Sequence, residues 1–326
     1  MRRFYRTKYG GPEVLRAEEV AIPHPAAGEL LIRVAYAGVN RTDSGFLTGI
    51  PKFARIFLGF PKPKAKVLGC EFSGKVVAVG EGVRRFRVGD RVFGFDDARF
   101  GGFADYLCLP EKTTVTQLPA SVDYKTGAML GEGSHYALCD LRAARVGSGS
   151  RVLVYGASGA IGSAAVQLAR ALGASVTAVC GTQATERVKT LGAQQVLDYQ
   201  NGELEQHHEQ YDLFFDAVGK LSWSASRRFL SPKGIYISTE LGPGNENPFL
   251  ALTAPFRRGQ KLLFPIPVNR IEDFEWFAEL AGKGEFTPLF DRIYPFEQLP
   301  EALSYVLSGQ KLGNVLLEVS GDQLDA

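Results

Sequence analysis

Hydrophobic positions in the first part of the chain fall in short β-rich segments that are separated by turn residues. Residues 29–37, 75–79 and 91–95 are such segments, and Gly80-Glu81-Gly82 and Gly89-Asp90 are typical of the turns between strands. This pattern predicts a β-rich region over about the first 120 residues.

From about residue 123 the pattern changes to strands that alternate with helices. The predicted strands are 151–155, 175–180, 196–199, 213–218, 234–239 and 261–265, with helices that include 160–172, 186–191 and 221–230. Alternation at this spacing indicates a parallel, doubly wound sheet. A helix at 271–281, a strand at 291–296, a helix at 300–307 and a strand at 314–319 are expected to follow.

A glycine-rich turn lies between the strand at 151–155 and the helix that follows it. Its sequence is Gly156-Ala157-Ser158-Gly159-Ala160-Ile161-Gly162, one residue longer in its first spacing than the strict dinucleotide fingerprint. Glycines permit a tight turn, and the N-terminus of the helix offers free N–H groups to a pyrophosphate. We therefore expect a dinucleotide to contact Gly156, Ser158, Gly159, Ala160 and Ile161.

The end of the second strand bears on which dinucleotide binds. NAD sites place a carboxylate there, whereas this chain has Cys180-Gly181-Thr182 and no carboxylate before Glu186. Small polar groups and a cation suit a 2′-phosphate, so Gly181, Thr182 and Arg187 favour NADPH. The alternative, that Arg187 is an ordinary surface residue of its helix, is left open.

Composition and charge exclude several other classes of protein. The net charge is +2, which gives no electrostatic footprint for nucleic acid. The four cysteines are isolated in the sequence, which fits a reducing compartment such as the cytoplasm. No segment reads as a secretory signal or a membrane span, so no membrane partner is expected. The lysine- and phenylalanine-rich loop at 50–67 is interpreted as a solvated loop held by apolar anchors, and a nucleic-acid patch is the second alternative, which the near-neutral net charge disfavours.

These residues belong to a wider pattern that covers nearly the whole chain. Further parts of it are residues 29–34, 37–43, 68–74, 88–94, 102–106, 197–199, 216–219 and 313–316. The chain resembles the medium-chain dehydrogenase/reductase superfamily, in its zinc-free quinone oxidoreductase (zeta-crystallin-like) branch. The resemblance implies a GroES-like β-rich catalytic domain over 1–122, a Rossmann domain over 123–267, and a return to the catalytic domain over 268–326.

The resemblance also bears on metal binding. Zinc-dependent relatives have cysteine at the position of Asn40 and histidine at that of Cys70, and near the third ligand position this chain has Gly131-Glu132. A catalytic zinc needs three protein ligands, so no metal is expected, and Cys70 is interpreted as a small buried residue.

Without zinc, only hydrogen bonds stabilise the negative charge that hydride transfer creates. This suits a conjugated acceptor, a quinone or an α,β-unsaturated carbonyl, whose charge spreads into a quinolate or enolate. The resemblance implies that Asn40 donates from its amide and that Asp43 orients it or holds water, with turn capping as the alternative for Asp43. Tyr136 is expected to replace a family hydroxyl, Tyr199 to pack on the adenosine, and Lys311 to add a charge near the cofactor.

A homodimer that pairs through the strand at 261–265 is expected.

Two alternative functions remain open at this point. One is an NADP-dependent reductase or dehydrogenase of simple carbonyls or alcohols, since fold does not fix substrate. The other is a non-catalytic NADPH-binding protein of the crystallin type. Hydrolases and P-loop enzymes lack support, because neither a Gly-x-Ser-x-Gly motif nor a Gly-Lys pair followed by Ser or Thr occurs.

Overall fold

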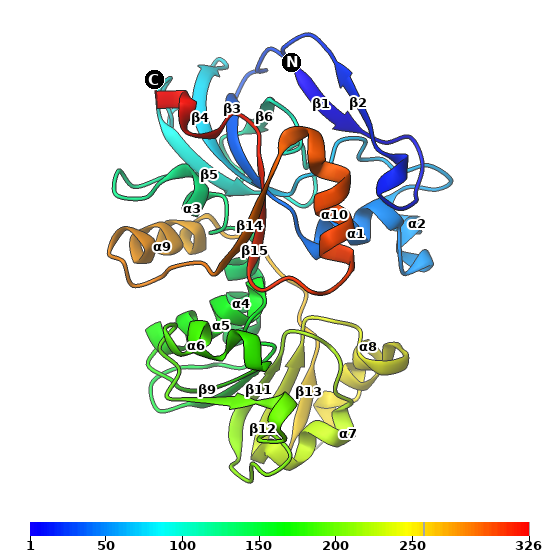
Figure 1. Cartoon of the computed structure of the whole chain (residues 1–326), viewed down its shortest axis with the longest axis vertical. Helices are drawn as coiled ribbons and strands as arrows, with labels where there is room; N and C mark the ends of the chain where they lie inside the picture. The colour runs from blue at the N-terminus through cyan, green and yellow to red at the C-terminus, as the bar shows by residue number, and fades with distance from the viewer. Residues whose placement is uncertain (257, 326) are drawn as a thin grey trace. The chain divides into compact units, whose positions relative to one another are not determined.

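The computed structural model describes residues 1–256 and 258–325, which divide into two compact units (Figure 1). The first unit comprises residues 1–132 and 270–284 together with the chain from Phe290 onward. The second comprises residues 133–269 and 285–289.

Seven strands form the main sheet of the first unit, in the order β14-β15-β3-β4-β5-β7, with β6 also paired to β3. Their bounds are β3 Glu29–Gly38, β4 Glu71–Val79, β5 Arg91–Phe95, β6 Tyr106–Pro110, β7 Thr116–Gln117, β14 Phe290–Pro295 and β15 Asn314–Glu318. β15 runs antiparallel to β3, with Leu316 opposite Gly38. The last strands therefore return to this unit because they pair with an edge of β3 that would otherwise expose its backbone N–H and C=O groups.

The first unit continues past the expected boundary at residue 122, as far as Glu132. The short helix α3, Tyr124–Gly127, is capped by Asp123, whose carboxylate accepts a hydrogen bond from the Thr126 amide at 2.7 Å. The Ser73 hydroxyl of β4 donates to the Tyr124 carbonyl at 2.5 Å, and Arg91 of β5 lies over the Tyr124 ring. These contacts attach α3 to the sheet of the first unit.

Helices and a small hairpin complete the first unit. They are α1 Arg41–Thr48, α2 Arg55–Leu58, α9 Ile271–Gly282, α10 Leu299–Leu307, and the antiparallel pair β1 Arg2–Tyr5 and β2 Arg16–Glu19. The apolar residues of α9 recur at helical spacing, and Phe274 stacks on Phe95 with ring centroids 6.4 Å apart. The expected helices at 271–281 and 300–307 are confirmed to within one residue at each end.

A six-stranded parallel sheet forms the second unit, in the order β10-β9-β8-β11-β12-β13. Its strands are β8 Arg151–Tyr155, β9 Ser175–Cys180, β10 Gln195–Asp198, β11 Tyr211–Asp216, β12 Leu230–Ser238 and β13 Lys261–Leu263. This order is that of the dinucleotide-binding doubly wound fold, and it reverses direction between β8 and β11. Ligands of such sheets bind beyond the carboxyl ends of the strands at this reversal, where the glycine-rich turn begins.

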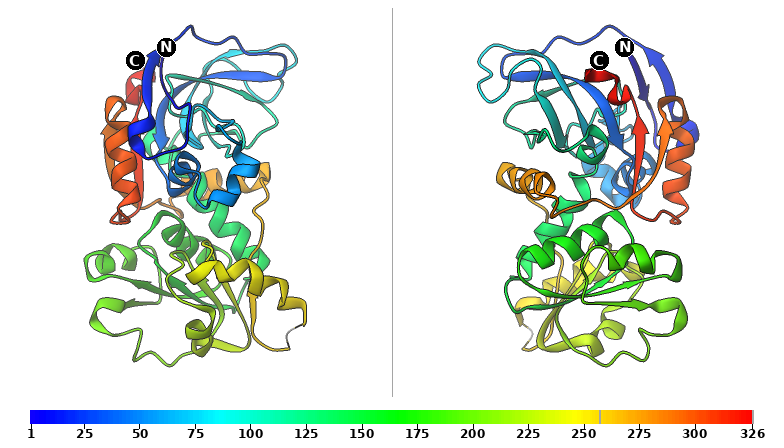
Figure 2. Two further views of the ribbon diagram at one scale, coloured as in Figure 1. Left: turned by 90° about the vertical axis from the view of Figure 1, so that its right-hand side faces the viewer. Right: turned by 60° about the vertical axis from the view of Figure 1, so that its left-hand side comes forward.

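The helices of the second unit are α4 Glu132–Ala143, α5 Ala160–Ala171, α6 Thr185–Lys189, α7 Trp223–Ser226 and α8 Glu246–Leu252. α5 contacts β8 and β9, and α8 contacts the edge strand β13 (Figure 2). The single helix expected at 221–230 is instead the one-turn α7 followed by a 3-10 turn, Arg227–Phe229. Trp223 and Phe229 are both buried in the core of the sheet. The chain leaves the α-helical path between them so that both side chains face this core.

Two further features of the described chain bear on earlier expectations. All four cysteines are free thiols. None of the helices within the described ranges has both the length and the apolar content needed to cross a bilayer.

Candidate active site

The glycine-rich turn connects β8 to α5, as the sequence predicts. Gly156 has φ +82°, a left-handed conformation that favours glycine, and a Cβ there would collide with Val218, which follows β11. A Cβ on Gly162 would collide with the carbonyl oxygen of Gly156. Both glycines are therefore required by the close packing of the turn against its own backbone and against β11.

Gly159 is different, because packing does not require it. A Cβ on Gly159 would meet only the Gly156 carbonyl oxygen, at 3.5 Å, an ordinary contact. Gly159 is the N-cap of α5, and Ala160, Ile161 and Ser158 are half-buried beside it. The Ser158 hydroxyl has no hydrogen-bond partner among the described residues, and the first amides of α5 lack intrahelical acceptors. Free donors, partial exposure and the positive end of the helix dipole fit a pyrophosphate at this turn.

The end of β9 carries polar groups that interact with its neighbour β10. Thr182 donates its hydroxyl to the Asp198 carboxylate at 2.6 Å, and the Thr182 amide donates to the Gln200 side chain at 3.0 Å. Asp198 lies in this position because the parallel register places it beside Cys180. β9 itself ends without a carboxylate, as the sequence shows, but the adjacent strand supplies one that sequence reasoning missed.

The other predicted adenosine contacts lie close to this strand end. Tyr199 follows Asp198, and its ring lies 6.2 Å from that of Tyr155. The Tyr199 hydroxyl is 3.3 Å from the point where a Cβ of Gly181 would lie. Arg187 is exposed on α6. The second unit therefore brings Gly181, Thr182 and Tyr199 together, and Arg187 stands on the helix that follows them.

In the first unit, the start of α1 brings Asn40 and Asp43 into the interior. Asp43 is fully buried, and its carboxylate accepts hydrogen bonds from the backbone amides of Asn40 at 3.1 Å and Gly69 at 2.9 Å. The carboxylate thus caps α1 and ties it to the segment before β4. The Asn40 amide is oriented by a different residue, since its Nδ2 donates to Glu71 at 2.8 Å.

Glu71 and Glu132 form a buried pair with Asn40, Thr42 and Cys70 around them. The Glu132 amide donates to the Glu71 carboxylate at 2.7 Å. The Thr42 hydroxyl donates to Glu132 Oε1 at 2.6 Å, and the Cys70 thiol lies 3.4 Å from Glu132 Oε2. Glu71, Glu132 and Cys70 are buried, whereas Thr42 is only half-buried. Thr42 is therefore the member of this group that links the buried acids to the more accessible surface of the unit.

Burial governs the protonation of these groups. Loss of water raises the pKa of both Glu71 and Glu132, and nearby carboxylates raise each further, Glu132 acting on Glu71 and Asp43 on Glu132. Burial raises the pKa of Asp43 to about 7, against the lowering effect of its backbone hydrogen bonds. Because adjacent carboxyl groups in an apolar interior cannot all ionise, the pair retains a proton at neutral pH.

Lys311 lies within electrostatic range of this acid pair. Its Nζ donates to the Gly313 carbonyl at 3.1 Å, burial lowers its pKa, and the charges of Glu132 and Glu71 act to raise it. The sequence had suggested Lys311 as a charge near the cofactor. The structure adds that Lys311 stabilises negative charge on Glu132 and Glu71.

Asp43, Cys70 and Glu132 bring one possible metal-ligand atom each to within 4.8 Å of one another. From the sequence, only Cys70 and Glu132 were candidate metal ligands, and the structure adds Asp43 as a third candidate. The chemistry of the three groups fits a metal poorly. The Asp43 oxygens already accept backbone hydrogen bonds, and burial beside carboxylates raises the pKa of the Cys70 thiol well above its ordinary value, which disfavours the thiolate that zinc binds.

Tyr136, the third residue expected in catalysis, belongs to the second unit. It is half-buried on α4, and its ring lies 5.3 Å from that of His135. His135 itself is buried, with Nδ1 3.9 Å from the Cys139 thiol. These contacts indicate a packed position for His135, whereas Tyr136 is only half-buried.

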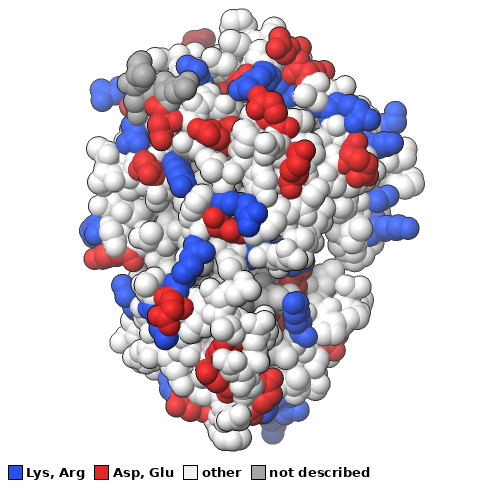
Figure 3. Space-filling view, in the orientation of Figure 1, with Lys and Arg blue, Asp and Glu red and all other residues white. Residues whose placement is uncertain are grey.

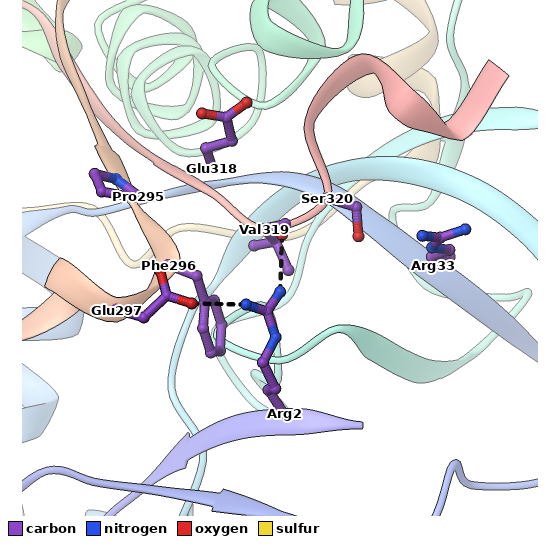
Figure 4. A pocket seen from close by; sticks show the side chains of 8 residues that line it. All are labelled: Arg2, Arg33, Pro295, Phe296, Glu297, Glu318, Val319 and Ser320. Atoms are coloured by element: carbon purple, nitrogen blue, oxygen red, sulfur yellow. Dashed lines mark hydrogen bonds and ion pairs between the residues drawn. The ribbon is translucent and has the colours of Figure 1, made fainter. Parts of the chain in front are cut away.

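A shallow polar pocket of the first unit involves a separate set of residues. Arg2 donates to Glu297 at 2.7 Å and to the Val319 carbonyl at 3.1 Å within it (Figure 4). Arg2 also pairs with Asp105, at 2.9 Å. These interactions join β1 to the last strands, which is a structural role.

Comparisons with known proteins identify the family of the chain. Residues 26–120 match the alcohol dehydrogenase GroES-like domain, and residues 191–317 match the family described as zinc-binding dehydrogenase. The chloroplastic quinone-oxidoreductase homolog of Spinacia oleracea is 31% identical over 322 residues, which cover 95% of both chains. The chain belongs to the medium-chain dehydrogenase/reductase superfamily, in its quinone oxidoreductase branch. It is thus an oxidoreductase of a family that uses a nicotinamide cofactor and acts on small molecules.

Other relatives extend this comparison. The quinone oxidoreductase of Sus scrofa is 31% identical over 309 residues and 90% of each chain. The solved quinone oxidoreductase from Coxiella burnetii has the same fold, with a TM-score of 0.86, 24% identity, and 98% and 99% of the two chains covered. A cobalt- and zinc-bound alcohol dehydrogenase from Pyrobaculum aerophilum also superposes, with a TM-score of 0.80, 26% identity, and 98% and 100% covered. The predicted GroES-like and Rossmann folds are confirmed.

Proposed function

We propose that the protein is a zinc-independent, NADPH-dependent reductase of quinones or α,β-unsaturated carbonyls. The observation that carries this proposal is the hydrogen bond between half-buried Thr42 and Glu132, a buried acid whose pKa is raised by burial and by the charge of Asp43. Reduction of a conjugated acceptor by hydride leaves an oxyanion, which needs a proton. The quinone-reductase names of the relatives support the same substrate class.

The cofactor would be held by residues of the second unit. The first amides of α5 and the Ser158 hydroxyl would hold the pyrophosphate, and Thr182, Arg187 and Tyr199 would contact the adenosine end. When bound, the nicotinamide supplies a hydride to a carbon of the acceptor. Thr182 already donates to Asp198, so the positive charge of Arg187 is the main attraction for a 2′-phosphate.

Side chains of the first unit would complete the reaction. In the reaction the Thr42 hydroxyl turns from Glu132 to the oxyanion, so that protonated Glu132 donates its carboxyl proton to the Thr42 oxygen while Thr42 passes its own proton to the oxyanion. The acceptor thus gains one hydride and one proton, and Glu132 is left as a carboxylate that Lys311 stabilises until solvent reprotonates it. Asn40, held by Glu71, is the candidate donor of this unit that stabilises the oxyanion before protonation, and the phenol of Tyr136 is the candidate of the second unit. Asp43 positions Asn40 by capping α1.

A second candidate is a metal-dependent alcohol dehydrogenase. The grouping of Asp43, Cys70 and Glu132 within 4.8 Å is the observation that favours it, together with the alcohol dehydrogenases among the similar structures. In that case a metal would polarise the alcohol or carbonyl oxygen directly.

One experiment separates the two candidates. NADPH oxidation is measured against quinones, enones, aldehydes and ketones, with metal analysis of the same dialysed sample. We expect turnover of quinones or enones, no stoichiometric zinc, and no change with chelator. One zinc per chain, with alcohol oxidation that a chelator abolishes, would establish the second candidate instead.

We also propose that the enzyme is a homodimer located in the cytoplasm. β13 is an edge strand of its sheet, and the exposed apolar side chains of Phe249, Leu252, Phe256 and Ile266 lie on or near the segments that flank it. An unpaired edge beside apolar side chains is a suitable surface for a second copy. Light scattering should give twice the mass of the 35.5 kDa chain, and Ile266→Asp should reduce it to one chain. A monomeric wild-type protein at micromolar concentration would refute the dimer.

A further inference from the structure

The segment 50–66 places five large apolar side chains in solvent. Ile50 is 65% exposed, Phe53 59%, Ile56 74%, Phe57 76% and Phe60 80%. The sequence had suggested that these phenylalanines anchor the loop to the interior, and that expectation is wrong. Apolar residues gathered on one short exposed segment commonly mark an interaction site.

Other residues hold the backbone of this segment in place. The Arg55 side chain donates to the Gly49 and Thr48 carbonyls at 3.0 and 2.9 Å and packs over the Tyr9 ring. The Tyr9 hydroxyl donates to the Gly59 carbonyl at 2.7 Å, and the Arg6 amide donates to the Lys66 carbonyl at 2.9 Å. The apolar side chains are therefore exposed on a fixed scaffold, with α2 at its centre.

The charge of the same segment is entirely positive. It carries Lys52, Arg55, Lys62, Lys64 and Lys66, and no acidic residue occurs between Asp43 and Glu71. The four lysines are exposed. The whole chain has a net charge of only +2, so the segment is much more basic than the rest. In Figure 3, lysine and arginine side chains stand beside uncharged ones at the edge where Figure 1 places α2.

We propose that residues 50–66 form a docking site for an anionic lipid bilayer surface. The exposed phenylalanine and isoleucine side chains would enter the interface below the headgroups, and the lysines would lie on the lipid phosphates. Apolar insertion combined with attraction to anionic headgroups is how peripheral segments bind membranes. The inference does not depend on the proposed function. The sequence-based expectation of no membrane partner was drawn from spanning segments, which a surface-bound segment does not need.

A lipid surface fits this segment better than a protein partner does. The cores of protein interfaces are depleted of lysine, whereas here lysines flank the phenylalanines along the chain, one before them and three after them. Long lysine side chains next to apolar groups match the boundary between acyl chains and phosphates, because each reaches its preferred layer.

Vesicle cosedimentation of the full-length protein tests the proposal. Vesicles of phosphatidylcholine alone are compared with vesicles in which about a third of the lipid is phosphatidylglycerol. Because a basic residue near an anionic surface contributes roughly fivefold to binding, we expect binding to the anionic vesicles at least twentyfold tighter. Added salt should weaken it.

Two paired variants locate the site. Lys62→Glu with Lys64→Glu should lower binding to anionic vesicles by at least about twentyfold, and Phe57→Ser with Phe60→Ser by at least about tenfold. The matched controls alter exposed residues elsewhere, Lys112→Glu with Lys233→Glu and Ile22→Ser with Val88→Ser, and should bind as the wild type does. Thermal unfolding confirms that each variant is folded, and exposed positions make this the expected result.

Three outcomes would overturn the proposal. The first is equal binding of the wild type to both kinds of vesicle. The second is binding that the control pairs lower as much as the segment variants do. The third is loss of a dimer in sedimentation velocity for Phe57→Ser with Phe60→Ser, which would make the segment a protein interface.

Discussion

The two units carry candidate functional groups of opposite kinds. In the second unit the proposed cofactor contacts are backbone groups of one continuous segment, Gly156 to Ile161, which lies half-exposed at the start of α5. The first unit assembles buried side chains from distant parts of the chain, Asn40 and Thr42, then Glu71, Glu132 and Lys311. A backbone site tolerates changes of side chain but not of glycine, whereas a side-chain cluster depends on the proton and charge of each member.

The largest effect is expected at the buried acids. Glu132→Gln keeps an acceptor for Thr42 but removes the acidic proton, so kcat should fall by at least about a hundredfold in quinone reduction. Because the acid must be protonated to donate, the wild-type rate should fall as pH rises through the raised pKa of Glu132, and this decline should vanish in the variant. NADPH affinity, measured by fluorescence titration, should not change.

Thr42 provides the control for this prediction. Thr42→Val should lower kcat as Glu132→Gln does, whereas Thr42→Ser, which keeps the hydroxyl, should stay close to the wild type. If Glu132→Gln retained a third or more of the wild-type kcat, the proton path through Thr42 would be wrong. The first unit would then not depend on the proton of a buried side chain, and this contrast with the backbone groups of the second unit would be lost.

An intermediate effect is expected at the backbone site, where two glycines should behave differently. Gly159→Ala should keep the wild-type melting temperature but weaken cofactor binding by roughly thirtyfold, since the new methyl group meets only one atom of the protein and is added at the N-cap of the helix proposed to hold the pyrophosphate. Gly162→Ala should instead lower the melting temperature, because its methyl group collides with the Gly156 carbonyl.

Thermal unfolding and cofactor titration of the same samples separate these results. Gly147→Ala is the control, since no atom lies within 4 Å of the added methyl group. Unchanged cofactor affinity in Gly159→Ala would show that the turn does not hold the pyrophosphate.

A smaller effect is expected for the choice of cofactor. Wild-type protein should bind NADPH at least about tenfold tighter than NADH, because one charged hydrogen bond contributes about 1.5–3 kcal/mol. Arg187→Ala should remove most of this preference and leave NADH affinity unchanged, and Arg170→Ala, on the exposed side of α5, should change neither. Gly181→Asp should lower NADPH affinity and spare NADH. Equal affinities in the wild type would refute the role of Arg187.

The smallest effect is the pH dependence of stability. Burial raises the pKa of Asp43 to about 7 and that of Asp140 to about 8, while the unfolded chain releases these protons near pH 4. Between about pH 4 and these raised pKa values, the folded protein therefore binds more protons than the unfolded chain does. The free energy of unfolding should consequently fall as pH rises from about 5 to 8. Calorimetry should show a melting temperature several degrees lower at pH 8.

Asp140→Asn should flatten this slope, because Asp140 is buried in the second unit and its shift comes from burial alone. Glu301→Gln, at an exposed position of α10, should leave the slope unchanged. A melting temperature that rose with pH over this range would contradict the raised pKa values.

Local patterns predicted most of the fold. β8 and β9 occupy the ranges expected for them, and α5 begins at the expected residue, because strand periodicity and glycine turns are properties of contiguous sequence. The helix at 221–230 was misjudged, since the burial of Trp223 and Phe229 in one core overrides helical propensity. The boundary at 122 was expected too early for a similar reason, as α3 packs on a sheet distant in sequence.

By itself, the sequence determined the glycine-rich turn, the succession of strands and helices along the chain around it, and the absence of a carboxylate at the end of β9, because each depends on neighbouring residues. Only the tertiary structure decided three other features. It placed Asp198 beside Thr182 through the register of two strands. It joined Thr42 to Glu132, which lie far apart in the chain, and it left the phenylalanines of residues 50–66 in solvent. Proton affinity and exposure depend on what surrounds a group in space, and the order of residues along the chain does not specify those surroundings.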